Sequence, residues 1–288
     1  MTIKTILVAA SGGSATGGAV DLACRLAQRF RAHLEGYHVL LDPQAALAAL
    51  GDGVGLGLTS TLIESMIAEA QIKAAETRSL FDQILARREI AVGNGPHPVE
   101  CRASACWREE AGYAPALVAN RARFFDLAVL GRSERVVGEP YTDTIEQVLA
   151  SSGRPVLLAP ADAPPTFGKT IAIAWNGSPQ AVRALAAGLP FLASAEAVWL
   201  ITAGPDDGDR AASAVEYLAW HGISARHRDL PDRPGRHVGR VLLEAAYSNG
   251  ADLLVMGGYG HAPWRELVLG GATREALGRM TMPILLVH

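Results

Sequence analysis

The feature that most constrains the fold of this chain is an internal duplication. Three segments recur in the same order: Ile6–Ser11 with Ile171–Asn176, Asp126–Gly131 with Asp252–Gly257, and Arg154–Leu158 with Met282–Leu286. Repetition in one order indicates two copies of one structural unit. A chain of 288 residues is long enough for two ordinary domains. We therefore expect domains at residues 1–160 and 168–288, joined by the proline-rich stretch 160–165.

The first copy is predicted to carry an insertion. Ile6 and Ile171 are farther apart along the chain than Asp126 and Asp252, by about 39 residues. Most of this surplus falls at residues 41–90, which begin with a glycine-rich run. A pattern rich in Ala, Glu, Ile and Leu follows from Leu62 to Glu89. This composition predicts a loop that leads into a long helix.

Both copies have the pattern of an α/β fold. Short apolar runs alternate with amphipathic stretches, which predicts parallel strands covered by helices. In the second copy the expected strands are Thr170–Ala174, Ala197–Thr202, Ser224–Arg228, Leu253–Met256 and Ile284–Val287. Five strands in each copy suit a doubly wound, Rossmann-like domain. Such sheets bind ligands beyond the carboxyl ends of their strands, where the winding reverses, so we expect a site after Ala174 and Met256.

The composition excludes several classes of protein. Apolar residues make up 49% and charged residues 19%, which is typical of a chain that folds into a packed core. The net charge of −3 is spread along the chain, which argues against a nucleic-acid partner. We find no apolar run of the roughly 20 residues that a membrane helix needs, and no signal peptide. The three cysteines have no metal-ligand spacing and fit a reduced, cytoplasmic protein.

No catalytic or metal-binding motif is apparent. The eight histidines form no paired-ligand pattern, and the chain has no GxSxG nucleophile motif. Cys106 and Trp107 are expected at the start of a helical stretch, a position that can lower the pKa of a thiol. A single cysteine is more often inert, so this residue is a weak candidate.

A glycine-rich segment after Met256 has the spacing of an anion-binding loop. Gly257 and Gly260 enclose two residues, nine more follow, and Gly270 and Gly271 precede a predicted helix with Thr273 in its first turn. Glycines allow a close backbone approach, and the free N–H groups of a helix start favour an anion such as phosphate. The simpler interpretation is that these glycines only turn the chain. A Walker loop is absent, since GK(S/T) is missing.

With this spacing the chain resembles the tandem universal stress proteins, which use Gly-x2-Gly-x9-Gly-(Ser/Thr) after their fourth strand to hold ATP phosphates. The segments AWNGSPQAVRAL and PILLVH are also similar to that family. The resemblance implies a cytosolic stress-response regulator that binds ATP, AMP or ADP in its second domain. It also implies that the last strands, 156–159 and 284–287, meet between the domains in a pseudo-dimer, and that the chain forms a homodimer. The candidate binding residues are Ala174, Trp175, Asn176, Met256, Gly257, Gly260, His261, Arg265, Gly270, Gly271, Ala272 and Thr273.

The chain departs from the family pattern at several of these positions. Asn176, and Ser11 in the first copy, stand where the family has an acidic residue, so binding of Mg²⁺ there is in doubt. Gly271 replaces the first hydroxyl of the phosphate motif, while Thr273 matches the next one. In the first copy the second glycine is missing after Gly131, and Asp143 lies in the matching cradle, where it would repel phosphate. Asp143 is equally an ordinary helix-start acid. We predict a degenerate site in the first copy.

The sequence is compatible with several alternatives. Trp175 could stack on a base or simply fill the core, and His261 and Arg265 could contact phosphate or solvent. The protein could be an interaction scaffold without a nucleotide, in which residues 41–90 line a groove for a protein or a small ligand. A weaker alternative is slow ATP hydrolysis.

Overall fold

The computed structural model describes residues 2–13, 15–40, 56–93, 102–132, 140–162, 164–203, 209–231, 238–258 and 282–288, and the structural statements below concern these ranges. The strands of the first half are β1 (Thr5–Ala9), β2 (His33–Leu40), β3 (Ala91–Val92), β4 (Ser104–Ala111), β5 (Leu127–Gly131) and β6 (Val156–Ala159). Its helices are α1 (Thr16–Phe30), α3 (Leu56–Arg87), α4 (Ala114–Ala122) and α5 (Pro140–Ser151).

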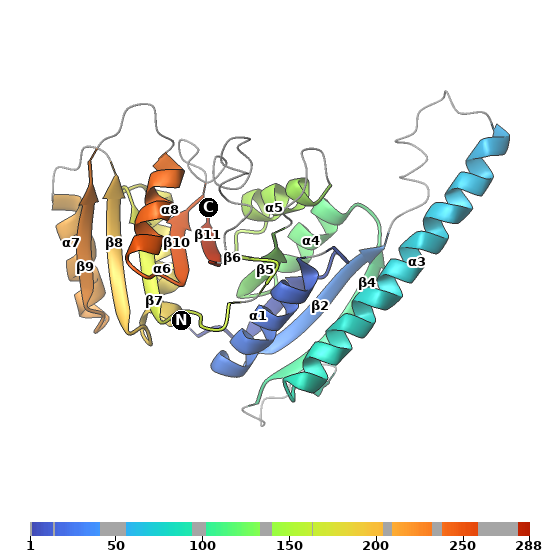
Figure 1. The fold of residues 1–288 in the computed structure, drawn as a ribbon, viewed down its shortest axis with the longest axis horizontal. Helices are drawn as coiled ribbons and strands as arrows, with labels where there is room; N and C mark the ends of the chain where they lie inside the picture. Colours follow the sequence, from blue (N-terminus) through green and yellow to red (C-terminus); the bar gives the residue numbers. More distant parts are fainter. Residues whose placement is uncertain are drawn as a thin grey trace.

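The second half repeats this arrangement in a shorter form (Figure 1). Its strands are β7 (Thr170–Trp175), β8 (Ala197–Ala203), β9 (Ala225–Leu230), β10 (Leu253–Gly257) and β11 (Ile284–Val287). Its described helices are α6 (Pro179–Leu192), α7 (Asp209–Trp220) and α8 (Val238–Ser248). The five strands predicted for this half are all present, with ends that differ by at most two residues.

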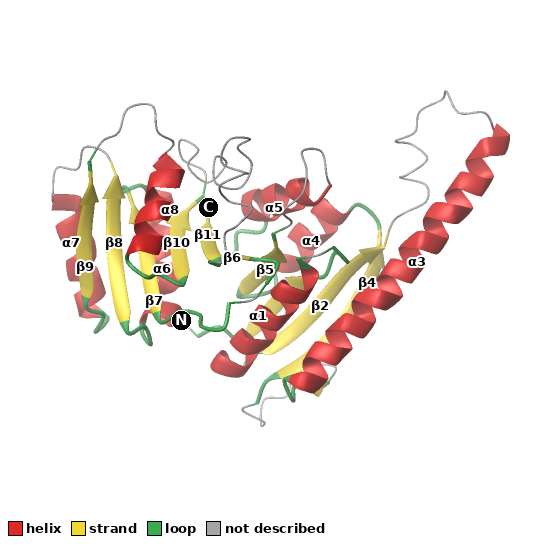
Figure 2. Ribbon diagram, in the orientation of Figure 1, coloured by secondary structure: helices red, strands yellow, loops and turns green. Residues whose placement is uncertain are grey.

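All the described strands form one sheet, in the order β3-β4-β2-β1-β5-β6-β11-β10-β7-β8-β9 (Figure 2). Each half is parallel and doubly wound, and the two halves join where β6 pairs with β11 in the antiparallel sense. Leu157 lies opposite Leu285 in this pair. The predicted α/β fold class is confirmed, as is the meeting of the last two strands between the halves. The first half has six described strands instead of the expected five, because the short β3 pairs with β4 at the edge of the sheet.

Alternating side chains divide the core between the two faces of the sheet. Along β1, Ile6 and Val8 pack on the face covered by α1, α3, α6 and α7, whereas Leu7 and Ala9 pack on the face covered by α4, α5 and α8. This alternation follows from the period of two along a strand. Because both faces are covered, the central strands are apolar throughout, as is typical of buried parallel sheets.

The duplicated aspartates have the same structural role in both halves. The carboxylate of Asp126 accepts hydrogen bonds from the backbone N–H groups of Lys4 (2.8 Å) and Thr5 (3.0 Å). Asp252 accepts the corresponding bonds from Lys169 (3.0 Å) and Thr170 (3.1 Å). Each aspartate therefore ties the start of one central strand to the start of its neighbour.

Along the chain, helix α3 and the short strand β3 come between β2 and β4, whereas α7 is the described element between β8 and β9 in the second half. The helix starts six residues before the predicted Leu62 and ends at Arg87, and Glu89 follows it in the left-handed conformation with φ of 54°. Phe81, Ile84 and Leu85 bury its C-terminal part against the core. Figure 1 shows the N-terminal part extending beyond the sheet.

The two halves also contact each other through helices. The guanidinium of Arg29 in α1 donates to the carbonyl of Phe191 (3.2 Å) and to the hydroxyl of Ser194. The rings of Phe30 and Phe191 meet edge to face at 5.4 Å. In the described part of the chain, no helix combines the length and the apolar character needed to cross a membrane.

Candidate functional site

The carboxyl end of β7 leads into α6 through a well-defined turn. Asn176 is exposed, and its side-chain oxygen accepts a hydrogen bond from the backbone N–H of Ser178 (3.1 Å). Ser178 then caps α6, since its hydroxyl accepts from the N–H of Ala181 (3.2 Å), and Pro179 occupies the first helical position. These local bonds hold the start of α6 in place beside the end of the strand.

The carboxyl end of β10 lies directly beside this turn. Met256 is in register with Ala174, and both side chains are buried. A Cβ on Gly257 would lie 2.7 Å from the carbonyl carbon of Gln180 and 2.8 Å from the nitrogen of Ala181. Only glycine therefore allows β10 and the first turn of α6 to approach this closely.

The chain winds outward in opposite directions from β7 and β10, so their junction is the reversal point of the second half. Ala174, Trp175, Asn176, Met256 and Gly257, five of the candidate residues, are brought together there. Open α/β sheets bind ligands in the crevice beyond such a point. The remaining candidates, Gly260, His261, Arg265, Gly270, Gly271, Ala272 and Thr273, lie outside the described residues.

The corresponding edge of the first half is covered by the inserted helix. Gly12, in the turn after β1, has a φ of 75°, and a Cβ there would lie 2.7 Å from the hydroxyl oxygen of Thr77 and 2.8 Å from Cε of Lys73. Both side chains come from α3. Gly131 repeats the close approach of Gly257, since its Cβ would lie 2.6 Å from the carbonyl oxygen of Ala15. The two halves thus share a backbone arrangement, but α3 packs over the turn after β1.

Comparison with known proteins agrees with this architecture. A universal stress protein of Synechocystis sp. is 21% identical over 295 residues, covering 98% of this chain and 99% of that protein. The crystal structure of a universal stress protein from Archaeoglobus fulgidus matches 99% of the chain and 96% of its own, with a TM-score of 0.71 at 14% identity. The chain is a homologue of the universal stress proteins.

A putative universal stress protein from Pseudomonas aeruginosa also has this fold, with a TM-score of 0.55 and 17% identity. That match covers 99% of this chain and 93% of the other. No protein-family model matches the chain. Because the similarity to both structures extends over nearly the whole chain, it includes both halves of the sheet.

The universal stress protein fold places one candidate, Trp175, in the core. Its side chain is 8% exposed and belongs to the cluster on the α6 face, and its indole N–H is buried without a hydrogen-bond partner among the described residues. A buried donor without a partner costs free energy. A hydrogen bond from this N–H to an acceptor at the edge of the sheet would therefore be favourable.

Next to Trp175, the sheet carries a polar cluster that the sequence interpretation missed. Thr202 is the cross-strand neighbour of Trp175, and its buried hydroxyl donates to Asp229 (3.0 Å) and lies 2.9 Å from Nε2 of His227. His227 and Asp229 alternate with arginines along β9, and Thr202 lies on a different strand, so only knowledge of the strand register could have revealed the cluster.

The described residues offer a metal ion few ligands at Asn176, the position where the family pattern would place one. The side-chain oxygen of Asn176 is neutral and already accepts the bond from Ser178. Within the described ranges, no group of three His, Cys, Asp or Glu side chains is arranged to hold an ion. Mg²⁺ prefers carboxylate and phosphate oxygens, so the protein offers it no described ligand here.

The prediction for Cys106 and Trp107 was wrong, because both lie in strand β4. This strand pairs in parallel along the whole of β2 and extends the sheet, and Trp107 packs against Phe81 with ring centroids 5.0 Å apart. Pairing with the otherwise open edge of β2 outweighs the helical preference that was expected for this charged segment. The thiol therefore lies at no helix start.

The environments of the two described cysteines suppress their reactivity. Burial and the nearby charge of Asp21 raise the pKa of Cys24 to about 12. Burial and Glu35 also raise the pKa of Cys106, whose Sγ lies 3.3 Å from Nε2 of His33. Both groups are thus held as thiols at neutral pH, and the thiolate is the reactive form.

We expect Cys24 and Cys106 to react slowly with an aromatic disulfide reagent, as measured in a Cys101→Ser variant. At about pH 8, Cys106 should react at least about tenfold more slowly than free cysteine, and Cys24 only when the protein unfolds. Absorbance of the released thiolate measures both rates, and unfolding in urea should equalise them. Rapid labelling of Cys24 in the folded protein would contradict the assignment.

Proposed function

We propose that the chain is a cytoplasmic regulator that binds one adenine nucleotide, ATP, ADP or AMP, in a domain formed by residues 168–288. The main support for this proposal is the junction of β7 and β10, where Gly257 allows the strand end to pack against the first turn of α6. The glycine spacing that continues to Thr273 starts at this junction. Phosphates at Gly257 to Thr273 and a base near Trp175 are consistent with the position of the reversal point.

In this proposal the domain at residues 1–160 has lost its nucleotide site. The packing of Lys73 and Thr77 against Gly12 supports the idea, since a ligand at the turn after β1 would compete with these side chains. Asp143 in the first turn of α5 adds a negative charge near the matching loop. The domain would then serve as the structural partner across the β6–β11 pair. A homodimer and a protein partner are further parts of the proposal.

Equilibrium dialysis with labelled ATP tests the proposal. We expect about one nucleotide bound per chain, because only the second half keeps its glycine spacing and none of the described helices packs over the turn after its first strand. Binding of two nucleotides would contradict the loss of the first site. No binding at millimolar ATP would overturn the proposal as a whole and favour a scaffold without a nucleotide.

The Asn176→Asp variant should make binding depend on Mg²⁺. An aspartate keeps an oxygen for the Ser178 N–H and adds the carboxylate that a cation between protein and phosphate requires. We expect ATP affinity about threefold to tenfold higher in millimolar Mg²⁺ than in EDTA, against little difference for the unaltered chain. Ser11→Asp, the matching change in the first half, should leave the affinity unchanged. An equal response of both variants would contradict the assignment of the site.

A further inference from the structure

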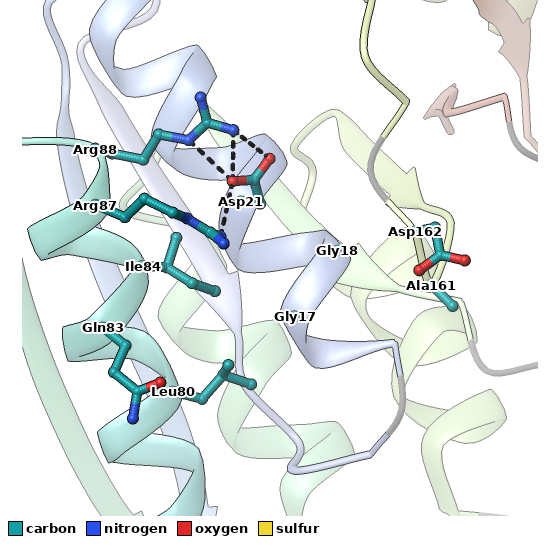
Figure 3. A pocket seen from close by; sticks show the side chains of 10 residues that line it. All are labelled: Gly17, Gly18, Asp21, Leu80, Gln83, Ile84, Arg87, Arg88, Ala161 and Asp162. Carbon is teal, nitrogen blue, oxygen red and sulfur yellow. Dashed lines mark hydrogen bonds and ion pairs between the residues drawn. The ribbon is translucent and has the colours of Figure 1, made fainter.

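A groove in the first half is formed by elements that the nucleotide proposal does not use. It has a volume of about 880 Å³ and lies along the start of α1, between the C-terminal part of α3 and the segment that follows β6 (Figure 3). Its lining residues are Gly17, Gly18, Asp21, Leu80, Gln83, Ile84, Arg87, Arg88, Ala161 and Asp162. Ligand pockets of small molecules commonly have volumes of about 300–1,000 Å³.

One end of the groove has a surplus of positive charge. Arg88 holds the carboxylate of Asp21 with three close contacts, from Nη2 to both oxygens (2.6 and 2.8 Å) and from Nε (2.9 Å). Arg87 reaches the same carboxylate only at 3.4 Å, and its side chain is 67% exposed. One carboxylate thus faces two guanidinium groups, and Arg88 satisfies it. The guanidinium of Arg87 remains available to an anionic group in the groove.

The opposite wall has the opposite charge. Ala161 and Asp162 face α1 from the side away from α3, as Figure 3 shows. Asp162 is exposed and forms no ion pair with a described residue. The carbonyl groups of Pro160 and Ala161 point toward Gly18, where a Cβ would lie 2.3 Å from either oxygen. These oxygens face the backbone of α1, whereas the exposed carboxylate of Asp162 is a suitable partner for an ammonium group.

Leu80, Gln83 and Ile84 line the α3 wall beside Arg87, and Gly17 and Gly18 of α1 lie between this wall and Asp162 (Figure 3). Ile84 is buried, Leu80 is half-buried, and Gly17 leaves the floor open, since a Cβ there would touch only Cδ2 of Leu80 at 3.9 Å. The four charged groups of the lining sum to zero, but the available positive charge and the available negative charge lie on opposite walls. Such a groove favours neither a simple anion nor a simple cation. It suits a ligand with two separated, opposite charges and an apolar body.

We propose that this groove binds a short apolar peptide with free termini, whose carboxylate pairs with Arg87 and whose ammonium group pairs with Asp162. Apolar side chains of the peptide lie on Leu80 and Ile84, and its backbone crosses Gly17. Neither the residues nor the elements of this groove contribute to the nucleotide junction in the second half, so peptide binding is independent of nucleotide binding.

Isothermal titration calorimetry with the full chain and the tripeptide Leu-Ala-Leu tests the proposal. We expect one peptide per chain. Acetylation of the peptide N-terminus and amidation of its C-terminus should each weaken binding by about fivefold, the value of one exposed ion pair. No binding at millimolar peptide, or equal binding of free and blocked peptides, would overturn the proposal.

Variants assign each terminus to its wall. Arg87→Gln should weaken binding of the free peptide by about fivefold but leave binding of the amidated peptide unchanged. Asp162→Asn should likewise weaken binding of the free peptide but leave binding of the acetylated peptide unchanged. Gly17→Leu should abolish binding by filling the floor while the fold stays intact, as thermal unfolding can verify. Arg78→Gln is the matched control, since Arg78 also lies on α3 but pairs with Asp82 outside the groove. A loss with Arg78→Gln equal to that with Arg87→Gln would overturn the assignment.

Discussion

Replacing Gly257 with alanine should destabilise the protein by about 3 kcal/mol and lower its affinity for ATP at least about tenfold. The new methyl group would lie 2.7 Å from the backbone of Gln180 and 2.8 Å from that of Ala181. Backbone atoms cannot turn aside as a flexible side chain can, so α6 must move away from β10. That movement separates the strand end from the helix start at the proposed nucleotide site.

The equivalent change in the first half separates the two effects. Gly131→Ala meets the carbonyl oxygen of Ala15 at 2.6 Å, so it should cost a similar free energy of unfolding. Nucleotide affinity should survive, because the first half is proposed to bind none. Urea unfolding and equilibrium dialysis measure both quantities, and Gly17→Ala, which meets only Leu80, is the control. Equal loss of ATP binding in both glycine variants would contradict a single site in the second half.

Replacing Arg121 with methionine should reduce the free energy of unfolding by about 3 kcal/mol. Arg121 in α4 donates two hydrogen bonds of 2.6 Å to the carboxylate of Glu35 in β2. The side chain of Glu35 is only 7% exposed, whereas that of Arg121 is 31% exposed. Loss of the arginine therefore leaves a buried carboxylate without its partner. The reverse change, Glu35→Gln, should cost less, since Arg121 can reach water.

A double variant shows whether the cost comes from the stranded charge. Glu35→Leu combined with Arg121→Met removes both charges and should recover most of the lost stability, because a well-packed apolar pair can replace a buried ion pair. Urea unfolding of the two single variants and the double variant gives the coupling energy. Additive losses would mean that Arg121 stabilises the protein by packing rather than by its charge. Arg240→Met, which breaks an exposed pair with Glu244, should change stability by less than about 1 kcal/mol.

The part of the fold that the sequence alone predicted depends on local pattern and repetition. The apolar runs of β7 and β10, the helix α3 and the two similar halves could be predicted because side-chain periodicity and repeats are properties of the chain itself. The duplicated Asp126 and Asp252 were recognised as part of the repeat. Their common role, holding the starts of two strands together, appeared only with the fold.

The tertiary structure decided the features that depend on contacts between distant segments. Cys106 lies in a strand because β2 offered an open edge, and neither Thr202 nor Asp229 could be paired without the strand register. The packing of α3 over Gly12, and the pair of Asp21 with Arg88, join elements far apart in the chain. The duplication by itself therefore determined two α/β halves with one intact glycine spacing. The covering of the turn after β1, and the place where a charged groove forms, were decided by how α3 packs, because side-chain contacts across the fold carry no local signal in the sequence.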